Sequence, residues 1–145
     1  MKKWMLTAAL TLLTVTAVMA TAPEGWYTDY QDAKKIAVEK HLPMYLLFTG
    51  SDWCPWCIKL HDEVLTQQAF IDYAKDKVVL VYLDFPKKAK LNQAEVMQNR
   101  ILSKSYNIEG FPTIVITDAD GKEQGRLGAT SLEDHLRDLK AMIKN

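Results

Sequence analysis

Two short, almost wholly apolar runs stand out along the chain, and segments with helical spacing surround them. The runs are Met44–Thr49 (MYLLFT) and residues 78–85 (VVLVYLDF). Because apolar and polar residues do not alternate in either run, both are typical of strands that are buried on both faces. A third run, Thr113–Thr117, is followed by an Asp120-Gly121 turn and by residues 125–127, and this order predicts a β-hairpin.

The segments around these strands carry apolar residues at helical spacing. Residues 29–40 predict an amphipathic helix, and residues 132–143 predict a final helix that Ser131 caps. Two further helices are expected, one capped by Thr66 and one within residues 91–106. In the latter, three residues are expected to face the core: Val96, Ile101 and Leu102. Strands that alternate with helices over short connections predict an α/β fold with a mixed or parallel sheet.

Residues 1–20 have the three-part layout of a secretory signal peptide. Two lysines supply the positive start, residues 4–18 are apolar apart from threonines, and small residues follow. Cleavage is expected after Ala20 or after Ala22. The apolar run is shorter than the about 20 residues that cross a bilayer, which disfavours an uncleaved membrane anchor. We therefore expect export to the periplasm and a single domain over residues 23–145.

The charge of the chain is balanced, with 18 Lys and Arg against 18 Asp and Glu. A surface without a basic stripe has no bias toward nucleic acid or an anionic membrane, so neither is expected as a partner. Once the signal peptide is removed, the length fits one domain of ordinary size. We expect a monomer.

The chain has two cysteines, Cys54 and Cys57, and both lie in GSDWCPWCIKL, residues 50–60. A disulfide stabilises a fold chiefly by closing a long loop in the unfolded chain, so a pair three residues apart contributes little stability. Zinc and haem attachment are alternative uses of this spacing. A haem-attachment motif has histidine directly after the second cysteine, where this chain has Ile58. A zinc site needs four ligands, and no second ligand pair accompanies the three histidines: His41, His61 and His135.

Reversible thiol–disulfide exchange fits both the spacing and the position of the cysteines. Residues i and i+3 of a helix face the same way with Cα atoms about 5 Å apart, within the range that a disulfide tolerates. Pro55 suits the first turn of a helix, which places Cys54 at the amino terminus, where unpaired N–H groups favour the attacking thiolate. Cys57, one turn deeper, is then the resolving thiol. Trp53 and Trp56 are either core residues or the apolar rim of a peptide-docking site.

Three segments together resemble the thioredoxin superfamily. They are WCPWC after a buried strand, YNIEGFPT at residues 106–113 and RLGATSLEDHLRDL at residues 126–139. Their order matches the superfamily, and they cover nearly the whole mature chain. The resemblance implies the thioredoxin fold, with a central mixed β-sheet flanked by helices on both faces. It is nearest to small periplasmic thioredoxin-like proteins of the DsbH kind, which resemble reductants rather than disulfide makers.

The resemblance also assigns roles to residues near the cysteines. Pro112 is implied to be the superfamily's cis-proline beside the disulfide, with the backbone of Phe111 offered to an extended client strand. Where the superfamily has a buried aspartate six residues before the first cysteine, this chain has Phe48. The proton acceptor for the deeper thiol must then be Asp84, Glu63 or water.

These features predict a thiol-disulfide oxidoreductase that reduces exported proteins through the Cys54–Cys57 pair, without a metal or other cofactor. Because Trp56 cannot donate a charge-assisted hydrogen bond to a thiolate, we expect a reduction potential of roughly −200 to −270 mV. The electron donor is expected to be a membrane reductase of the DsbD type. The proline–threonine order at residues 112–113 differs from the glutathione-binding pattern of glutaredoxins, so glutathione binding is not expected. The alternatives are a disulfide oxidase or isomerase of the same fold, and a module that binds a soft metal such as Cu(I).

Overall fold

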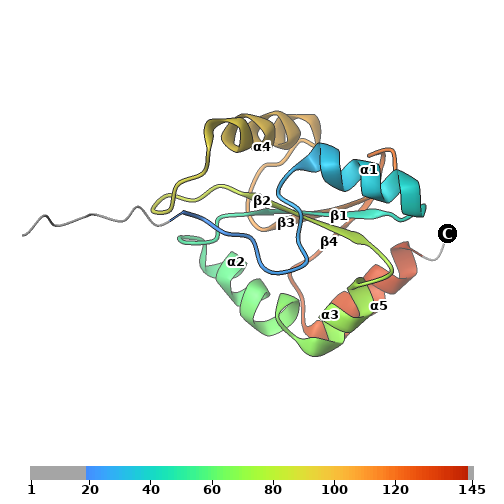
Figure 1. Cartoon of the computed structure of the whole chain (residues 1–145). Coiled ribbons are helices and arrows are strands. Elements are labelled where there is room, and N and C mark those ends of the chain that lie inside the picture. The colour runs from blue at the N-terminus through green and yellow to red at the C-terminus, as the bar shows by residue number, and fades with distance from the viewer. Residues whose placement is uncertain (1–18, 144–145) are drawn as a thin grey trace, which may run out of the picture.

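A mixed four-stranded sheet forms the centre of the computed structural model, which describes residues 19–143 (Figure 1). The strand order within these residues is β2-β1-β3-β4. β1 pairs in parallel with β2 and antiparallel with β3, and β3 and β4 form the antiparallel hairpin. The strands are β1 (Met44–Thr49), β2 (Val79–Asp84), β3 (Thr113–Thr117) and β4 (Glu123–Leu127). The predicted mixed sheet is therefore confirmed.

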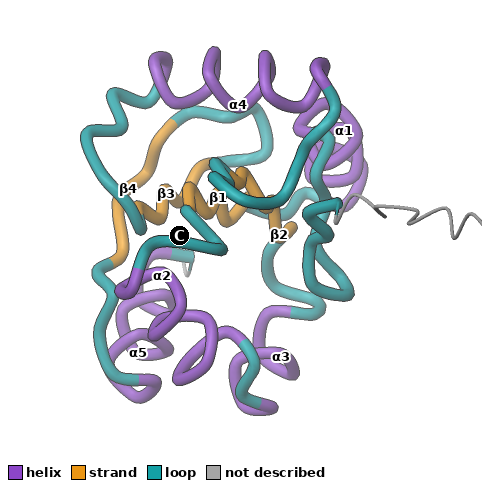
Figure 2. The backbone as a smooth tube through the Cα atoms, turned by 90° about the vertical axis from the view of Figure 1, so that its left-hand side faces the viewer, coloured by secondary structure: helices purple, strands orange, loops and turns teal. Residues whose placement is uncertain are grey.

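Helices cover both faces of this sheet. α1 and α4 lie on one face, and α2, α3 and α5 lie on the other, as the view in Figure 2 shows. A π-helical turn, η1, continues α2 directly. The bounds are α1 (Tyr30–Lys40), α2 (Pro55–Leu60), η1 (His61–Leu65), α3 (Gln68–Ala74), α4 (Gln93–Ser105) and α5 (Leu132–Met142). This arrangement confirms the thioredoxin fold that the resemblance implies.

β1 is buried along its whole length, because each face of the sheet has its own apolar core. Tyr45 and Leu47 belong to the core under α2, α3 and α5, whereas Met44, Leu46 and Phe48 belong to the core under α1 and α4. A fully buried apolar side chain of this size stabilises the fold by about 1.5–3 kcal/mol. The turn that leaves the end of β1 therefore starts from a rigidly held strand.

The ends of the first and last helices follow local capping rules, and the predicted cap of the last helix by Ser131 is confirmed. Asp29 caps α1 by accepting hydrogen bonds from the N–H groups of Gln31 and Asp32. His41 ends α1 in the left-handed conformation, with φ of 53°. Ser131 caps α5, where its hydroxyl accepts the N–H of Asp134.

The prediction that Thr66 caps the third helix is wrong. The helix that contains the cysteine pair extends through η1, so Thr66 lies at the end of that segment and not at the start of α3. Its hydroxyl donates to the carbonyl oxygen of Asp62 at 3.0 Å. α3 begins after Gln67, which makes no side-chain capping bond.

The prediction that Ile101 faces the core is also wrong, since 56% of this residue is exposed. The inner face of α4 is formed instead by Asn99 and Leu102, both buried, while Val96 is half-buried. The side-chain amide of Asn99 donates to the carbonyl oxygen of Asp84 at 2.9 Å. With Asn99 and Leu102 turned toward the sheet, Ile101 lies on the outer side of α4.

The described chain begins beside the connection after β2 and then reaches the outer edge of β2 itself. The predicted signal peptide lies outside the described residues as far as residue 18, and Met19 pairs with Lys90 in an isolated bridge. Tyr27 extends the sheet edge through a parallel bridge to Val81. Within residues 19–143, no helix combines the length and apolar character needed to cross a membrane.

His135 of α5 is fully buried in the core, where its two ring nitrogens have different partners. Nδ1 lies 3.2 Å from the carbonyl oxygen of Gly128, and Nε2 lies 3.0 Å from the hydroxyl of Tyr45. Because a carbonyl oxygen only accepts, Nδ1 carries the proton and Nε2 accepts from Tyr45. Burial lowers the pKa of His135 below its ordinary value of 6.5.

Acid is therefore expected to destabilise the protein through His135. The unfolded chain binds a proton at this residue at a higher pH than the folded chain does, so stability is full above about pH 6.5 and falls as the pH drops toward the folded pKa. Replacement of His135 with Gln should reduce this loss between about pH 7.5 and about pH 5.5. Urea unfolding at both pH values measures it, with the exposed His41→Asn as control. An identical pH dependence in His135→Gln and the wild type would contradict the prediction.

Candidate active site

Cys54 and Cys57 form a disulfide at the start of α2, with Cα atoms 5.2 Å apart. Cys54 is the N-cap residue, Pro55 occupies the first turn, and the N–H of Cys57 points at the Cys54 sulfur at a distance of 3.3 Å. A helix amino terminus directs unpaired N–H groups at the capping atom, and this favours negative charge there. Cys54 and Cys57 are only 5% and 3% exposed, so in this oxidised state both residues are covered to a similar extent.

A small pocket adjoins the covered side of Cys57. Its volume is about 140 Å³, and the N–H of Gly50 points at the Cys57 sulfur at a distance of 3.4 Å. The other residues that line the pocket come from β1, the turn after it, α2, η1 and β2: Leu47, Thr49, Ser51, Ile58, His61, Leu65 and Tyr82. Cys57 therefore faces a partly polar pocket, although most of its surface is buried.

Asp52 fastens the active-site turn to the connection between β2 and α4. Its carboxylate accepts three backbone N–H groups, from Lys87 at 2.9 Å, Lys88 at 2.7 Å and Ala89 at 2.8 Å. These hydrogen bonds, with that of Lys87 the largest contribution, lower the pKa of Asp52. The carboxylate therefore stays charged and holds two loops together.

Trp53 lies against the same connection. Its indole N–H donates to the carbonyl oxygen of Phe85 at 2.8 Å, and the Lys87 ammonium lies 3.9 Å from the centre of the indole ring. The ring also meets Phe111 edge-on, with centroids 6.1 Å apart. Gly50 leaves the space that the indole fills, since a Cβ there would lie 2.5 Å from the ring.

Trp56 behaves differently from Trp53, because 63% of it is exposed. The ammonium group of Lys59 lies 5.6 Å from its ring centre. The sequence left open whether Trp56 is a core residue or part of the apolar rim of a docking site, and its exposure excludes the core position. An exposed indole beside the dithiol is an apolar surface that a partner protein can cover.

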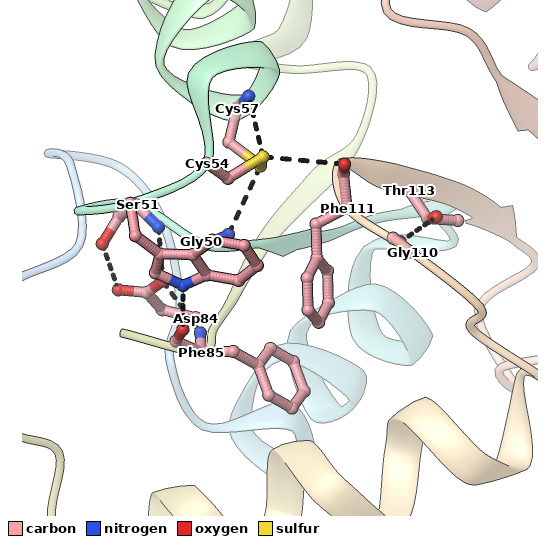
Figure 3. The surroundings of a disulfide bond; sticks show 10 residues. Gly50, Ser51, Cys54, Cys57, Asp84, Phe85, Gly110, Phe111 and Thr113 are labelled. Atoms are coloured by element: carbon pink, nitrogen blue, oxygen red, sulfur yellow. Dashed lines mark hydrogen bonds between the residues drawn. A yellow bond between two sulfur atoms is a disulfide. The ribbon is translucent and has the colours of Figure 1, made fainter. Parts of the chain in front are cut away.

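The loop before β3 reaches the disulfide from the opposite side (Figure 3). The Phe111–Pro112 peptide bond is cis, and the carbonyl oxygen of Phe111 lies 3.6 Å from the Cys54 sulfur. Thr113 donates from its hydroxyl to the carbonyl oxygen of Gly110 at 2.7 Å, which closes the loop. The Phe111 ring packs on Phe85, with centroids 4.8 Å apart. The predicted pair Phe111 and Pro112 therefore lies beside the predicted nucleophile.

Asp84 lies buried behind the active-site turn. Its carboxylate accepts the N–H of Ser51 at 3.0 Å, the hydroxyl of Ser51 at 2.6 Å and the N–H of Phe85 at 2.8 Å. Burial, the largest influence, raises the pKa of Asp84. Glu63 is exposed instead, 3.9 Å from Lys59. Of the two carboxylates that the sequence offers as proton acceptors, only Asp84 is buried close to the turn.

Sequence reasoning missed three residues of this site: Ser51, Asp52 and Phe85. The available signal was weak: two polar residues between a buried strand and the cysteine motif, and an aromatic residue after the next strand. Only the parallel pairing of β1 with β2 brings both strand ends to the same edge of the sheet. Nothing local in the sequence indicates which groups then meet.

The three histidines do not gather around the cysteines. His61 lines the pocket beside Cys57, whereas His135 is bound to Tyr45 in the core and His41 ends α1. In the part of the chain from residue 19 to residue 143, no group of three or more histidine, cysteine, aspartate or glutamate side chains is arranged to hold a metal ion.

Comparisons with known proteins agree with this geometry. The sequence matches the family described as Thioredoxin-like domain over residues 30–143. The disulfide bond reductase DsbH of Chlamydia pneumoniae is 37% identical over 113 residues, which make up 78% of this chain and 68% of that protein. The thioredoxin-related protein DsbJ of the same organism is 31% identical over 104 residues, or 72% of this chain and 30% of that protein.

A solved structure of a DsbH oxidoreductase has the same fold, with a TM-score of 0.77 at 30% sequence identity. The match covers 99% of this chain and 95% of the other. The resemblance inferred from the three sequence motifs is therefore confirmed in both sequence and structure.

Gly50→Ala is expected to destabilise the protein. The new Cβ would overlap the indole of Trp53, which cannot move away without losing its hydrogen bond to Phe85. Overpacking of this kind costs about 1–3 kcal/mol of unfolding free energy. Urea unfolding measures the loss. Gly110→Ala is the matched control, since a Cβ there has no neighbour within 4 Å, and an equal effect of both changes would contradict the prediction.

Proposed function

Because the chain belongs to the thioredoxin-like domain family and is a thiol-disulfide oxidoreductase, we propose that it works in the periplasm as a reductant of disulfides in exported proteins. The observation that carries the proposal is the position of Cys54. Its sulfur caps a helix on one side and lies 3.6 Å from the Phe111 carbonyl oxygen on the other. A nucleophile and a backbone acceptor for a client strand thus lie next to each other.

The reaction starts with the reduced pair. The Cys54 thiolate attacks one sulfur of the client's disulfide, a bond forms between Cys54 and that sulfur, and the other client sulfur leaves as a thiolate and takes a proton. The Cys57 thiolate then attacks Cys54, which releases the second client sulfur. Two electrons pass from the cysteine pair to the client, and the Cys54–Cys57 disulfide remains.

The residues around Cys54 fit the binding of an extended client strand. The Phe111 carbonyl oxygen can accept an N–H of that strand, and Pro112 holds this loop beside the disulfide. Trp56 offers an exposed apolar surface next to the sulfurs. Trp53 supports the turn through its hydrogen bond to the carbonyl oxygen of Phe85, and Pro55 supports it from the first turn of α2.

The reducing direction is supported by the contacts of the Cys54 sulfur. A strong oxidant stabilises its reduced thiolate unusually well. Here the sulfur has one N–H donor, that of Cys57, and a nearby carbonyl oxygen whose partial negative charge disfavours a second negative charge. The relative named a disulfide bond reductase supports the same direction.

Sustained reduction requires a supply of electrons from outside the chain. Because the proposed site of action is across the inner membrane, behind the predicted signal peptide, the donor must pass electrons through that membrane. A membrane reductase of the DsbD type is the partner that we propose. The clients are disulfide-containing exported proteins, and the protein acts as a monomer.

Replacement of Cys57 with Ala is expected to trap clients. Without the resolving thiol, the mixed disulfide on Cys54 persists and is visible as a higher-mass band on non-reducing gels of a periplasmic extract. Cys54→Ala is the matched control and should trap none, because Cys57 faces the pocket behind the turn, whereas the proposed client strand binds at the Phe111 loop beside Cys54. Insulin reduction should be lost in both variants. Trapping by Cys54→Ala but not by Cys57→Ala would reverse the two roles.

The reduction potential of the pair is expected to lie between roughly −200 and −270 mV. Equilibration with glutathione or dithiothreitol redox buffers, followed by alkylation of free thiols, measures it. A value near −120 mV would identify an oxidant and overturn the reducing role.

A further inference from the structure

The resolving step, on which the proposed function rests, requires Cys57 to lose a proton. A thiolate attacks a disulfide and a thiol does not. Cys57 is 3% exposed, so its proton has almost no direct route to bulk solvent. Some group on the covered side of the sulfur must take this proton or pass it on.

The pocket beside Cys57 offers such a route. Its volume of about 140 Å³ is far larger than the space that one water molecule needs, and polar side chains line part of it. Those side chains belong to Thr49, Ser51, His61 and Tyr82. A water molecule in the pocket can therefore join the Cys57 sulfur to a hydroxyl group.

Ser51 connects this pocket to a carboxylate. Its hydroxyl donates to Asp84 at 2.6 Å, while its lone pairs remain able to accept a second hydrogen bond. Its N–H also donates to Asp84, at 3.0 Å, so the position of Ser51 is fixed at two points. In Figure 3 the pair lies on one side of the sulfurs, and the Phe111 carbonyl lies on the other. Client binding and the Ser51–Asp84 pair thus occupy separate sides of the disulfide.

The charges around Asp84 favour its protonated form. Burial is the main reason that the pKa of Asp84 is raised; the hydrogen bonds from Ser51 and Phe85 oppose it in part, and the carboxylate of Asp52 adds to it. On α4, Glu95 also has a raised pKa, for which burial and Asp84 are responsible. Tyr82 of β2 has a pKa of about 12 because of burial and of Asp84, so its phenol stays neutral. The surroundings of Asp84 therefore raise the affinity of its carboxylate for a proton, which makes it a stronger acceptor than an ordinary aspartate.

We propose that Ser51 and Asp84 form a proton relay for Cys57, in which the pocket connects the thiol to Ser51 and Asp84 is the final acceptor. The proton leaves the Cys57 sulfur for a pocket water, that water passes a proton to the Ser51 oxygen, and Ser51 passes its own proton to Asp84. The Cys57 thiolate attacks Cys54, and the client sulfur leaves with the bonding electron pair. Protonated Asp84 returns its proton by the same route when the pair is reduced again.

Two other groups of the pocket have to be compared with Asp84 as acceptors. Tyr82 is a neutral phenol and has no basic site of comparable strength. His61 holds Nδ1 in an exposed 2.9 Å contact with Asp62. His61 is nevertheless a ring base that lines the pocket, so its removal is the decisive comparison.

The resolving step can be timed on its own. The reduced full chain is mixed with Ellman's reagent, which leaves a thionitrobenzoate group on Cys54, and the second burst of released thionitrobenzoate reports the attack by Cys57. Stopped-flow traces between about pH 5.5 and about pH 9 give the rate as a function of pH. The variants are Ser51→Ala, Ser51→Thr, Asp84→Asn and, for comparison, His61→Gln.

Ser51→Ala and Asp84→Asn should slow resolution by about tenfold or more near neutral pH and move the rise of the rate to higher pH, where hydroxide removes the proton directly. Ser51→Thr keeps the hydroxyl and should therefore show the wild-type pH profile. His61→Gln leaves the relay intact and should also show the wild-type pH profile. If Asp84→Asn does not fold, the comparison of Ser51→Ala with Ser51→Thr still decides whether the relay exists. Profiles of Ser51→Ala and Asp84→Asn that match the wild type, or a shift in His61→Gln alone, would overturn the relay.

This assay separates the relay from the proposed function. If the wild type reduces insulin but Ser51→Ala resolves at the wild-type rate, the relay alone is overturned. A protein whose resolution depends on Ser51 but that reduces no protein disulfide would overturn the reductase role alone.

Discussion

The parallel pairing of β1 with β2 is the constraint on which the rest of the site depends. Parallel neighbours present their carboxyl ends at the same edge of the sheet, so the turn after β1 and the connection after β2 must lie side by side. Three contacts then join them: Ser51 to Asp84, Asp52 to the backbone of residues 87–89, and Trp53 to Phe85. The cysteine pair is carried on a turn that is fixed from behind, which leaves its other side open to the loop at Phe111.

The different environments of the two carboxylates in this site, Asp52 and Asp84, follow from that strand pairing. Asp52 accepts three N–H groups at the surface and stays charged, whereas burial raises the pKa of Asp84. The two carboxylates thus take different tasks: Asp52, in the turn after β1, holds loops together, and Asp84, at the end of β2, is suited to proton transfer. Phe48 packs near Tyr106 in the core on the other face of the sheet, so the position that bears an aspartate in the superfamily contributes only apolar packing here.

The two tryptophans show how the same side chain serves two purposes on either side of Cys54. Trp53 fills the space above Gly50 and donates to Phe85, so it belongs to the support of the turn. Trp56 follows Pro55 in the first turn of α2 and is largely exposed to solvent. One indole stabilises the free protein, and the other is available to a partner.

The sequence by itself determined the strands, the ends of α1 and α5 and the place of Cys54 at a helix start, because periodicity, capping and proline act over a few neighbouring residues. It also located the disulfide pair and the loop at Phe111 and Pro112 through motifs. Only the tertiary structure decided that Ile101 faces outward, that Trp56 is exposed, that His135 is buried, and that Ser51 meets Asp84. These outcomes depend on contacts between groups far apart in the chain, 33 residues apart for Ser51 and Asp84, and no local pattern specifies which distant group arrives.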